Sequence, residues 1–162
     1  MAGETFAPPT PPSGSTFMAG HTARVRQIEA TRQSLVVLGK PRYIHLGGIE
    51  SDGHTGETYE RLRNAAEIPL CAEDFRGLTV TLRVWARLSE LAGSETYMQV
   101  RLRNIDDGSD VAETEEIVST SLAKYEAVCT LPEGTTPKWC RLEIVSSDGT
   151  PAYAFGGLEV KL

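Results

Sequence analysis

Strict alternation of apolar and polar side chains over residues 77–88 is the sequence feature that most constrains the fold of this chain. In GLTVTLRVWARL, apolar residues occupy every second position, and Thr, Arg and Trp85 fill the positions between them. A strand with one buried face requires this period, because successive side chains leave opposite faces of the sheet. The pattern predicts a long central strand of an antiparallel sandwich. Its inward positions are Leu78, Val80, Leu82, Val84, Ala86 and Leu88.

The chain after residue 88 repeats this rhythm in shorter segments separated by turn signals such as Asp106-Asp107-Gly108. Further strands are predicted at 96–104, 111–119, 122–131, 138–146 and 152–162. Short strands at roughly regular spacing are typical of a sandwich or a barrel, so we predict an all-β protein. The residues expected in its core are Val80, Leu82, Val84, Met98, Val100, Leu102, Leu142, Ile144, Leu158 and Val160.

The first 20 residues differ sharply in composition from the rest of the chain. They contain four of the nine prolines, and Glu4 is their single charged side chain. Proline runs favour an extended conformation and exclude a helix or a central strand. We therefore predict that residues 1–20 are a Pro-rich extended arm, which binds another subunit and adds nothing to the domain's own core. The residues expected to make this contact are Phe6, Pro8, Pro9, Pro11, Pro12, Phe17 and Met18.

Residues 21–46 form a basic connecting segment, in which positive side chains exceed negative ones by four. Its pattern fits one short helix or two strands, and its charge suits either an acidic partner surface or a solvated face. Residues 47–58, rich in Gly and Asp, are predicted to form a loop. The β-sandwich domain is assigned to residues 47–162, and Pro69 argues against a central strand in its early part.

Two turn segments carry side chains of the kinds that bind metals. Asp52, His54 and Glu57 share one loop, whereas metal sites usually draw three or more converging ligands from several elements. The segment 104–110, NIDDGSD, lacks the glycine position and the following bidentate Glu of a calcium loop, and a hairpin turn is predicted instead. Neither a metal nor a cofactor is therefore predicted.

Six carboxylates lie between Asp106 and Glu116 without an intervening Lys or Arg. Paired carboxylates hydrolyse glycosides only when they face each other across a cleft, so a solvated edge strand is the preferred interpretation. No nucleophile motif, phosphate loop or His/Asp/Ser set is apparent. We predict that the protein is not an enzyme.

Composition argues against two further classes of partner, nucleic acids and membranes. The net charge of −6 disfavours nucleic acid binding. No apolar run approaches the roughly 20 residues of a membrane helix, and the N-terminus lacks the order of a signal peptide. Three widely spaced cysteines without a CxxC pair are interpreted as buried thiols in a reducing cytosol. A Cys129–Cys140 disulfide is the alternative.

Two tryptophans are candidates for a ligand face. Trp85 lies on the polar side of its predicted strand between Arg83 and Arg87, and Trp139 begins another strand. Aromatic side chains on a sheet face can stack on sugar rings, which makes Trp85 and Trp139 the best sequence argument for carbohydrate binding. The preferred alternative is that this face is covered by the N-terminal segment or by a neighbouring subunit.

Three segments carry a resemblance to known proteins: GLTVTLRVWARLSE (77–90), YMQVRLRNIDD (97–107) and AYAFGGLEVKL (152–162). In these segments the chain resembles the jelly-roll domains of tailed-phage virion proteins, which include capsid decoration (cement) proteins and tail-appendage domains similar to carbohydrate-binding modules. The resemblance covers roughly residues 68–162 and transfers no active-site residues. It implies a jelly-roll-type antiparallel β-sandwich and a virion component.

The resemblance and the arm together predict a non-enzymatic virion structural protein. Decoration proteins of this kind often extend an N-terminal arm over neighbouring capsid subunits, so the expected role is docking on the shell and clamping adjacent subunits. The expected partners are the major capsid protein or other virion subunits, and a homo-oligomer is a further candidate arrangement. The expected location is the virion, assembled in the host cytoplasm. A tail adaptor or fibre-attachment protein and a carbohydrate-binding module are the alternatives.

Overall fold

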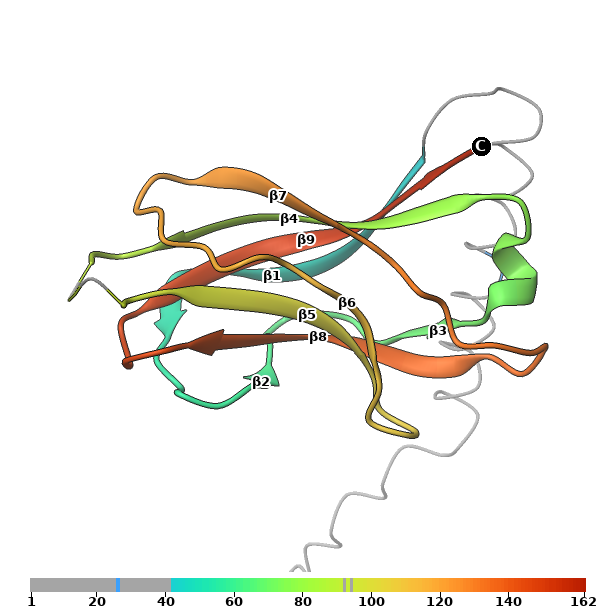
Figure 1. Cartoon of the computed structure of the whole chain (residues 1–162), viewed down its shortest axis with the longest axis horizontal. Helices are drawn as coiled ribbons and strands as arrows, with labels where there is room; N and C mark the ends of the chain where they lie inside the picture. The colour runs from blue at the N-terminus through green and yellow to red at the C-terminus, as the bar shows by residue number, and fades with distance from the viewer. Residues whose placement is uncertain (1–25, 27–41, 92, 94) are drawn as a thin grey trace, which may run out of the picture.

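The computed structural model describes Arg26 and residues 42–162 apart from residues 92 and 94, with the backbone alone for residues 49–53. In residues 42–162 the chain forms nine strands and a short 3-10 helix, η1 (Figure 1). The strands are β1 (Arg42–His54), β2 (Glu60–Arg61), β3 (Ile68–Leu70), β4 (Thr79–Leu88), β5 (Met98–Asn104), β6 (Asp110–Glu113), β7 (Ala123–Val128), β8 (Lys138–Ser146) and β9 (Ala152–Lys161); η1 spans Ala72–Phe75.

The strands form two antiparallel sheets that pack face to face. Sheet A has the order β1-β9-β4-β7, and sheet B has the order β2-β8-β5-β6, with β3 also paired to β8. The pairings are nested: β5 with β6, β4 with β7, β2 and β3 with β8, and β1 with β9. This nesting is that of one long antiparallel ribbon rolled up so that each arm contributes to both sheets, which defines a jelly roll. The predicted fold class is confirmed.

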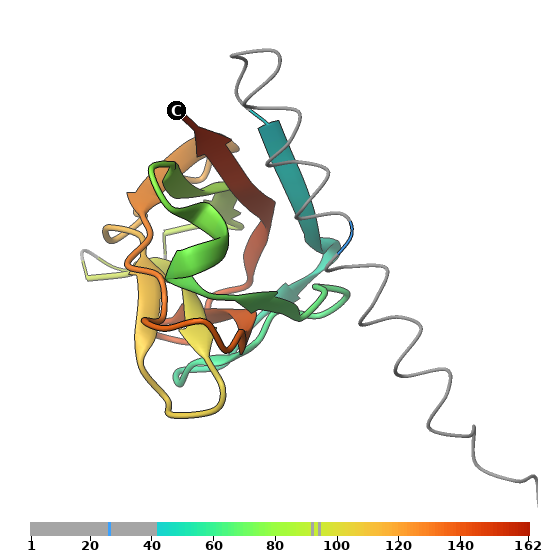
Figure 2. The ribbon, with the colours of Figure 1, turned by 90° about the vertical axis from the view of Figure 1, so that its right-hand side faces the viewer.

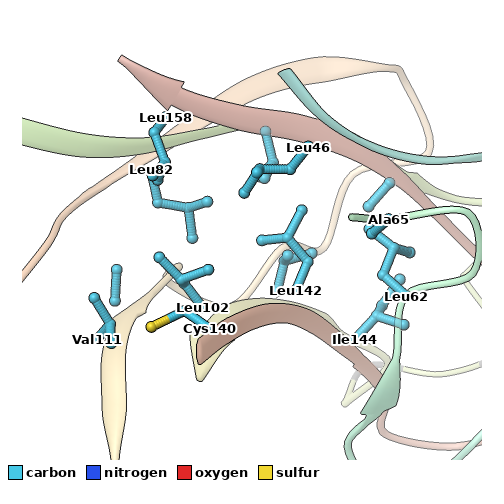
Figure 3. Close-up of a cluster of buried hydrophobic side chains, with 14 of the residues drawn as sticks. Leu46, Leu62, Ala65, Leu82, Leu102, Val111, Cys140, Leu142, Ile144 and Leu158 are labelled. Carbon is cyan, nitrogen blue, oxygen red and sulfur yellow. The ribbon is translucent and has the colours of Figure 1, made fainter. Parts of the chain in front are cut away.

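The core lies between the two sheets, as the alternation predicts. All ten residues expected in it are at most 3% exposed. Leu82 and Leu158 of sheet A point toward Leu102 and Leu142 of sheet B (Figure 3). Phe75 from η1 is also buried, and this helix covers one end of the sandwich (Figure 2).

The loop predicted at residues 47–58 is wrong for residues 47–54, because β1 continues to His54, whereas residues 55–58 lie outside any strand. Gly47 and Gly48 have φ angles of 97° and 144°, and the register with β9 shifts beside them. Glycine adopts such angles at low cost, so irregularities of this kind bend a strand without ending its pairing. The predicted boundary between residues 46 and 47 therefore falls inside β1, and strand pairing already begins at Arg42.

The strand edges match the sequence-based expectations. Pro69 lies in β3, which pairs with β8 alone. The acidic segment contains β6, the edge strand of sheet B.

The three cysteines are free thiols, two of them buried and Cys129 partly so. Burial raises the pKa of Cys129 and Cys140 to about 12, which keeps both thiols protonated at neutral pH.

Candidate functional site

The outer face of sheet A carries a cluster of aromatic side chains. Trp85 of β4 and Phe155 of β9 are directly opposed in the strand register. Their rings are stacked, with centroids 5.7 Å apart and planes 8° apart. The ring of Tyr43 from β1 meets Trp85 edge-on at 6.2 Å between centroids. We call the surface formed by Tyr43, Trp85 and Phe155 the aromatic face.

Tyr43 reaches this cluster by leaning across β9. Its backbone is paired with Glu159 of β9, yet its hydroxyl donates a hydrogen bond of 3.3 Å to the carbonyl oxygen of Arg83 on β4. Gly157 lies between the two strands and has no side chain to obstruct the ring. Burial raises the pKa of Tyr43 to about 12 despite the opposing charge of Arg83, so the hydroxyl remains a donor at neutral pH.

Gly157 also sets how closely β1 and β9 approach each other. A Cβ atom at this position would lie 2.0 Å from the carbonyl oxygen of Ile44. Real Cβ atoms are not found that close to backbone oxygen, so any other residue would push β1 away from β9. The absence of a side chain at Gly157 thus allows β1 to lie close enough to β9 for the ring of Tyr43 to contact Trp85.

Ion pairs border the aromatic face on one side. Arg83 donates to Glu126 at 2.7 Å and to Glu159 at 2.9 Å. Lys124 and Lys161 pair with these same carboxylates. Hydrogen bonds from Lys124 and Arg83 lower the pKa of Glu126. Both carboxylates are therefore paired within the sheet, where three cations share two acidic groups.

The aromatic side chains retain contact with solvent. Tyr43 is 40% exposed, whereas Trp85 and Phe155 are half-buried. Val128, at the β7 edge of the same face, is 71% exposed. On the other side of the aromatic pair, Arg87 stacks over the ring of Tyr153 at 4.4 Å. The face therefore presents apolar and aromatic surface that no side chain of the described residues fully covers.

Trp139 lies elsewhere. It belongs to β8 of sheet B, opposite Pro69, and its neighbour Cys140 is fully buried in the core. Alternation then directs Trp139 to the outer face of sheet B. The structure places the two tryptophans on opposite faces of the sandwich and does not bring them together. The predicted arm residues, from Phe6 to Met18, lie outside the described residues.

Sequence reasoning missed Tyr43 and Phe155 as members of the site. Phe155 shares the alternation of Tyr153 and Glu159, so its outward direction is readable from the sequence. Its position beside Trp85 depends on the pairing of β9 with β4, which joins residues 70 apart in the chain. No local signal specifies that pairing.

The outer face of sheet B carries a polar cluster, in contrast to the aromatic cluster on sheet A. Glu143 is 3% exposed and accepts hydrogen bonds from Arg101 and Arg141 at 2.7–2.9 Å. The Arg101 guanidinium lies 3.7 Å over the ring of Tyr59, whose hydroxyl donates to Glu113. Burial opposes ionisation of Glu143, but its two arginine partners outweigh that effect and lower its pKa. These groups satisfy one another, as in a structural network.

The two segments that carry side chains of metal-binding kinds, for which no metal was predicted, use several of these side chains in local contacts. His54 Nδ1 lies 3.8 Å from Glu60, and the side chain of Asp52 lies outside the described residues. Asn104 accepts from the backbone N–H of Asp106, as Asp107 does from Ser109. Among the described residues, no group of three His, Cys, Asp or Glu side chains is placed to hold a metal.

The described part of the chain contains no helix long and apolar enough to cross a bilayer.

Comparison with known proteins gives structural likenesses alone. No family model matches the sequence, and no curated protein matches it. Similar solved structures include infectious bursal disease virus Gx strain, with 14% identity and a TM-score of 0.44, and the VP2 subviral particle of infectious bursal disease virus, with 16% identity and a TM-score of 0.40. Each likeness covers 76% of this chain and 33% of the other.

A third similar structure is the Clostridium thermocellum xylanase 10B CBM22-1–GH10 modules complexed with xylohexaose, with 12% identity and a TM-score of 0.37. That likeness covers 77% of this chain and 24% of the other. The chain thus spans a third or less of the proteins that it resembles in structure. Two of the three come from viral particles and one from an enzyme with a carbohydrate-binding module. At these identities and TM-scores, none of their functions transfers to this chain.

Proposed function

We propose that this chain is a non-enzymatic structural protein of a tailed-phage virion: a capsid decoration (cement) protein that docks on the shell. The sequence resemblance supports the virion role, and its three segments fall on β4, on β5 with its turn, and on β9. Two of these strands, β4 and β9, are neighbours in sheet A and carry Trp85 and Phe155. The resemblance therefore covers two of the three strands that build the aromatic face, and β1 with Tyr43 lies outside it.

The aromatic face is the observation that carries this proposal. It combines a half-buried stacked pair with an exposed Tyr43, and the strongly exposed Val128 lies at the β7 edge of the same side of sheet A. Aromatic side chains are enriched in the buried centres of protein–protein contacts, where they contribute large contact area with few rotatable bonds. Its ion-pair border resembles the polar rim of such a contact. A protein surface is therefore the occupant that suits this face.

The N-terminal arm gives the proposed attachment its second contact. Once the folded body is docked, the arm searches for its own site at a high effective concentration, so two modest contacts sum to firm attachment. A copy that bridges two subunits in this way stabilises the seam between them. The proposed location of the protein is accordingly the virion.

The test is to locate and count the chain in purified particles. The proposal predicts a fixed stoichiometry to the shell subunit, and removal of residues 2–18 should weaken attachment. A chain found at the tail in a few copies would instead support a tail adaptor. Its absence from particles would contradict both roles.

A carbohydrate-binding role is the second candidate, favoured by the exposed aromatic side chains on a sheet face. Sugar rings stack on the open face of an aromatic ring. Here Trp85 and Phe155 turn one face toward each other, and Tyr43 directs its edge at Trp85, which reduces the area left for a sugar. Glycan arrays decide this point: binding that is lost in Trp85→Ala would favour the sugar-binding role over the docking role.

A further inference from the structure

We propose that the aromatic face of one copy is the docking site for residues 5–18 of a second copy. This inference rests on the proposed function only in treating the N-terminal arm as a binding segment. It goes further by naming the protein surface that meets the aromatic face: the arm of an adjacent copy, so that attachment to the particle is shared among linked copies.

The face suits an uncharged, ring-bearing ligand. Its centre is the stacked pair of Trp85 and Phe155 with Tyr43 edge-on beside them. The two carboxylates beside it, Glu126 and Glu159, are already engaged with Arg83, Lys124 and Lys161. An anionic ligand would have to compete with these carboxylates for the cations, whereas a neutral ligand can bury the aromatic surface and leave the pairs intact.

Residues 5–18 have the composition that such a face requires. The stretch TFAPPTPPSGSTFM has no charged side chain and carries four prolines and two phenylalanines. Proline-rich segments bind aromatic-lined surfaces in the polyproline II conformation, because they are already extended and lose little entropy on docking. Phe6 and Phe17, near the two ends of the stretch, add rings that can extend the aromatic cluster.

The strand direction favours a second copy over the same copy. Gly48 of β1 lies opposite Phe155, whereas the described strand begins at Arg42, opposite Val160. Toward the N-terminus, the backbone of β1 therefore runs roughly 20 Å along the sheet, away from the aromatic pair, and only the side chain of Tyr43 leans back toward Trp85. The segment must reverse its direction to return to its own face. An adjacent copy requires no reversal, and the residues between Met18 and Arg42 span up to about 80 Å when extended.

Tryptophan fluorescence tests this proposal, because the two tryptophans lie on opposite faces. The acceptor is the full-length chain with Trp139→Phe, so that Trp85 is the sole emitter, and with Phe6→Ser and Phe17→Ser to disable its own arm. The donor is the full-length chain with Trp85→Phe and Trp139→Phe, which keeps an intact arm and gives no tryptophan emission under selective excitation of tryptophan. Added donor should cause a saturable blue shift of Trp85 and a saturable fall in its quenching by acrylamide.

Two controls make the result specific. A donor that also carries Phe6→Ser and Phe17→Ser should leave Trp85 unchanged. An acceptor with Trp85→Phe, in which Trp139 reports on sheet B, should not respond to the intact donor. No response of Trp85 at high donor concentration would overturn the proposal, as would an equal response to the disabled donor.

Docking within one copy has its own signature. In the Trp139→Phe chain with its arm intact, it would give the blue shift at every dilution, with the chain monomeric by light scattering. That outcome would overturn the assignment to a second copy. Because this experiment contains no particle, its result is independent of whether the chain proves to be a virion component.

Discussion

Trp85 and Phe155 stand directly opposite each other on neighbouring strands, with their rings 5.7 Å apart and nearly parallel. The pair lies on the solvent side of sheet A, while the residues on either side of it in both strands are buried in the core. A stacked pair on an outer face contributes to stability and also forms a ready contact surface. These two roles can be separated experimentally.

The stability role is tested by a double-mutant cycle on this pair. We expect Trp85→Ala and Phe155→Ala each to lower the free energy of unfolding, and to be coupled by about 0.5–1.5 kcal/mol, because either change removes the same stacking contact. Urea unfolding of the four proteins measures the coupling. Strictly additive effects would show that the rings do not stack in solution.

The close approach of β1 and β9 depends on Gly157. Gly157→Ala should destabilise the protein by about 1–3 kcal/mol, as overpacking does elsewhere, because its Cβ would collide with the carbonyl oxygen of Ile44. Gly93→Ala is the matched control, since the nearest atom to its Cβ would lie 3.9 Å away. Thermal unfolding compares the two. Equal melting temperatures would mean that β1 is not held at this distance.

The packing between the two sheets predicts that truncating a buried side chain costs far more stability than truncating an exposed one. Leu82→Ala or Leu102→Ala should cost about 2–5 kcal/mol, because each leaves a cavity between the two sheets. Val128→Ala, at an exposed position on β7, should change the free energy of unfolding by less than about 0.5 kcal/mol. Chemical denaturation is the measurement. Similar small losses at all three positions would contradict the proposed packing.

Glu143 should make stability depend on pH. Its pKa is lowered in the folded state, so its contribution is complete above its unfolded-state pKa of about 4.3 and is lost as the pH falls through the folded-state value. Glu143→Gln should cost on the order of 1–3 kcal/mol at pH 7, and the difference from wild type should shrink below about pH 4.

The matched control for this residue is Glu133→Gln, at an exposed position between β7 and β8. Glu133→Gln should have the same free energy of unfolding as wild type at pH 7 and at pH 3. A deficit of Glu143→Gln that is the same at pH 7 and at pH 3 would show that the loss does not come from the ionised carboxylate.

Local pattern predicts much of this fold and little of its site. Alternation alone placed β4, β5, β8 and β9 and their buried residues, because a period of two is a local property of the chain. It could not find β1 beyond Gly47, because the glycines that allow a bulge look the same in sequence as those of a loop. The extent of sheet A was therefore underestimated.

The site depends on which strands become neighbours. Trp85 was recognised as facing outward, but its partners come from β9 and β1, which are distant from it in sequence. The pairing that joins them follows from rolling the whole ribbon and from the absence of a side chain at Gly157, not from any motif. Trp139 was grouped with Trp85 by residue type, and the topology separates them.

The central claim is that the aromatic face and the N-terminal arm together attach this chain to a particle. Quantitative co-sedimentation of the full-length protein with particles that lack it tests this most directly. Wild type and the Trp139→Phe control should bind saturably at a fixed ratio to the shell subunit. Trp85→Ala and the Phe6→Ser/Phe17→Ser variant should each bind much more weakly while remaining folded. Undiminished binding by both variants would contradict the account.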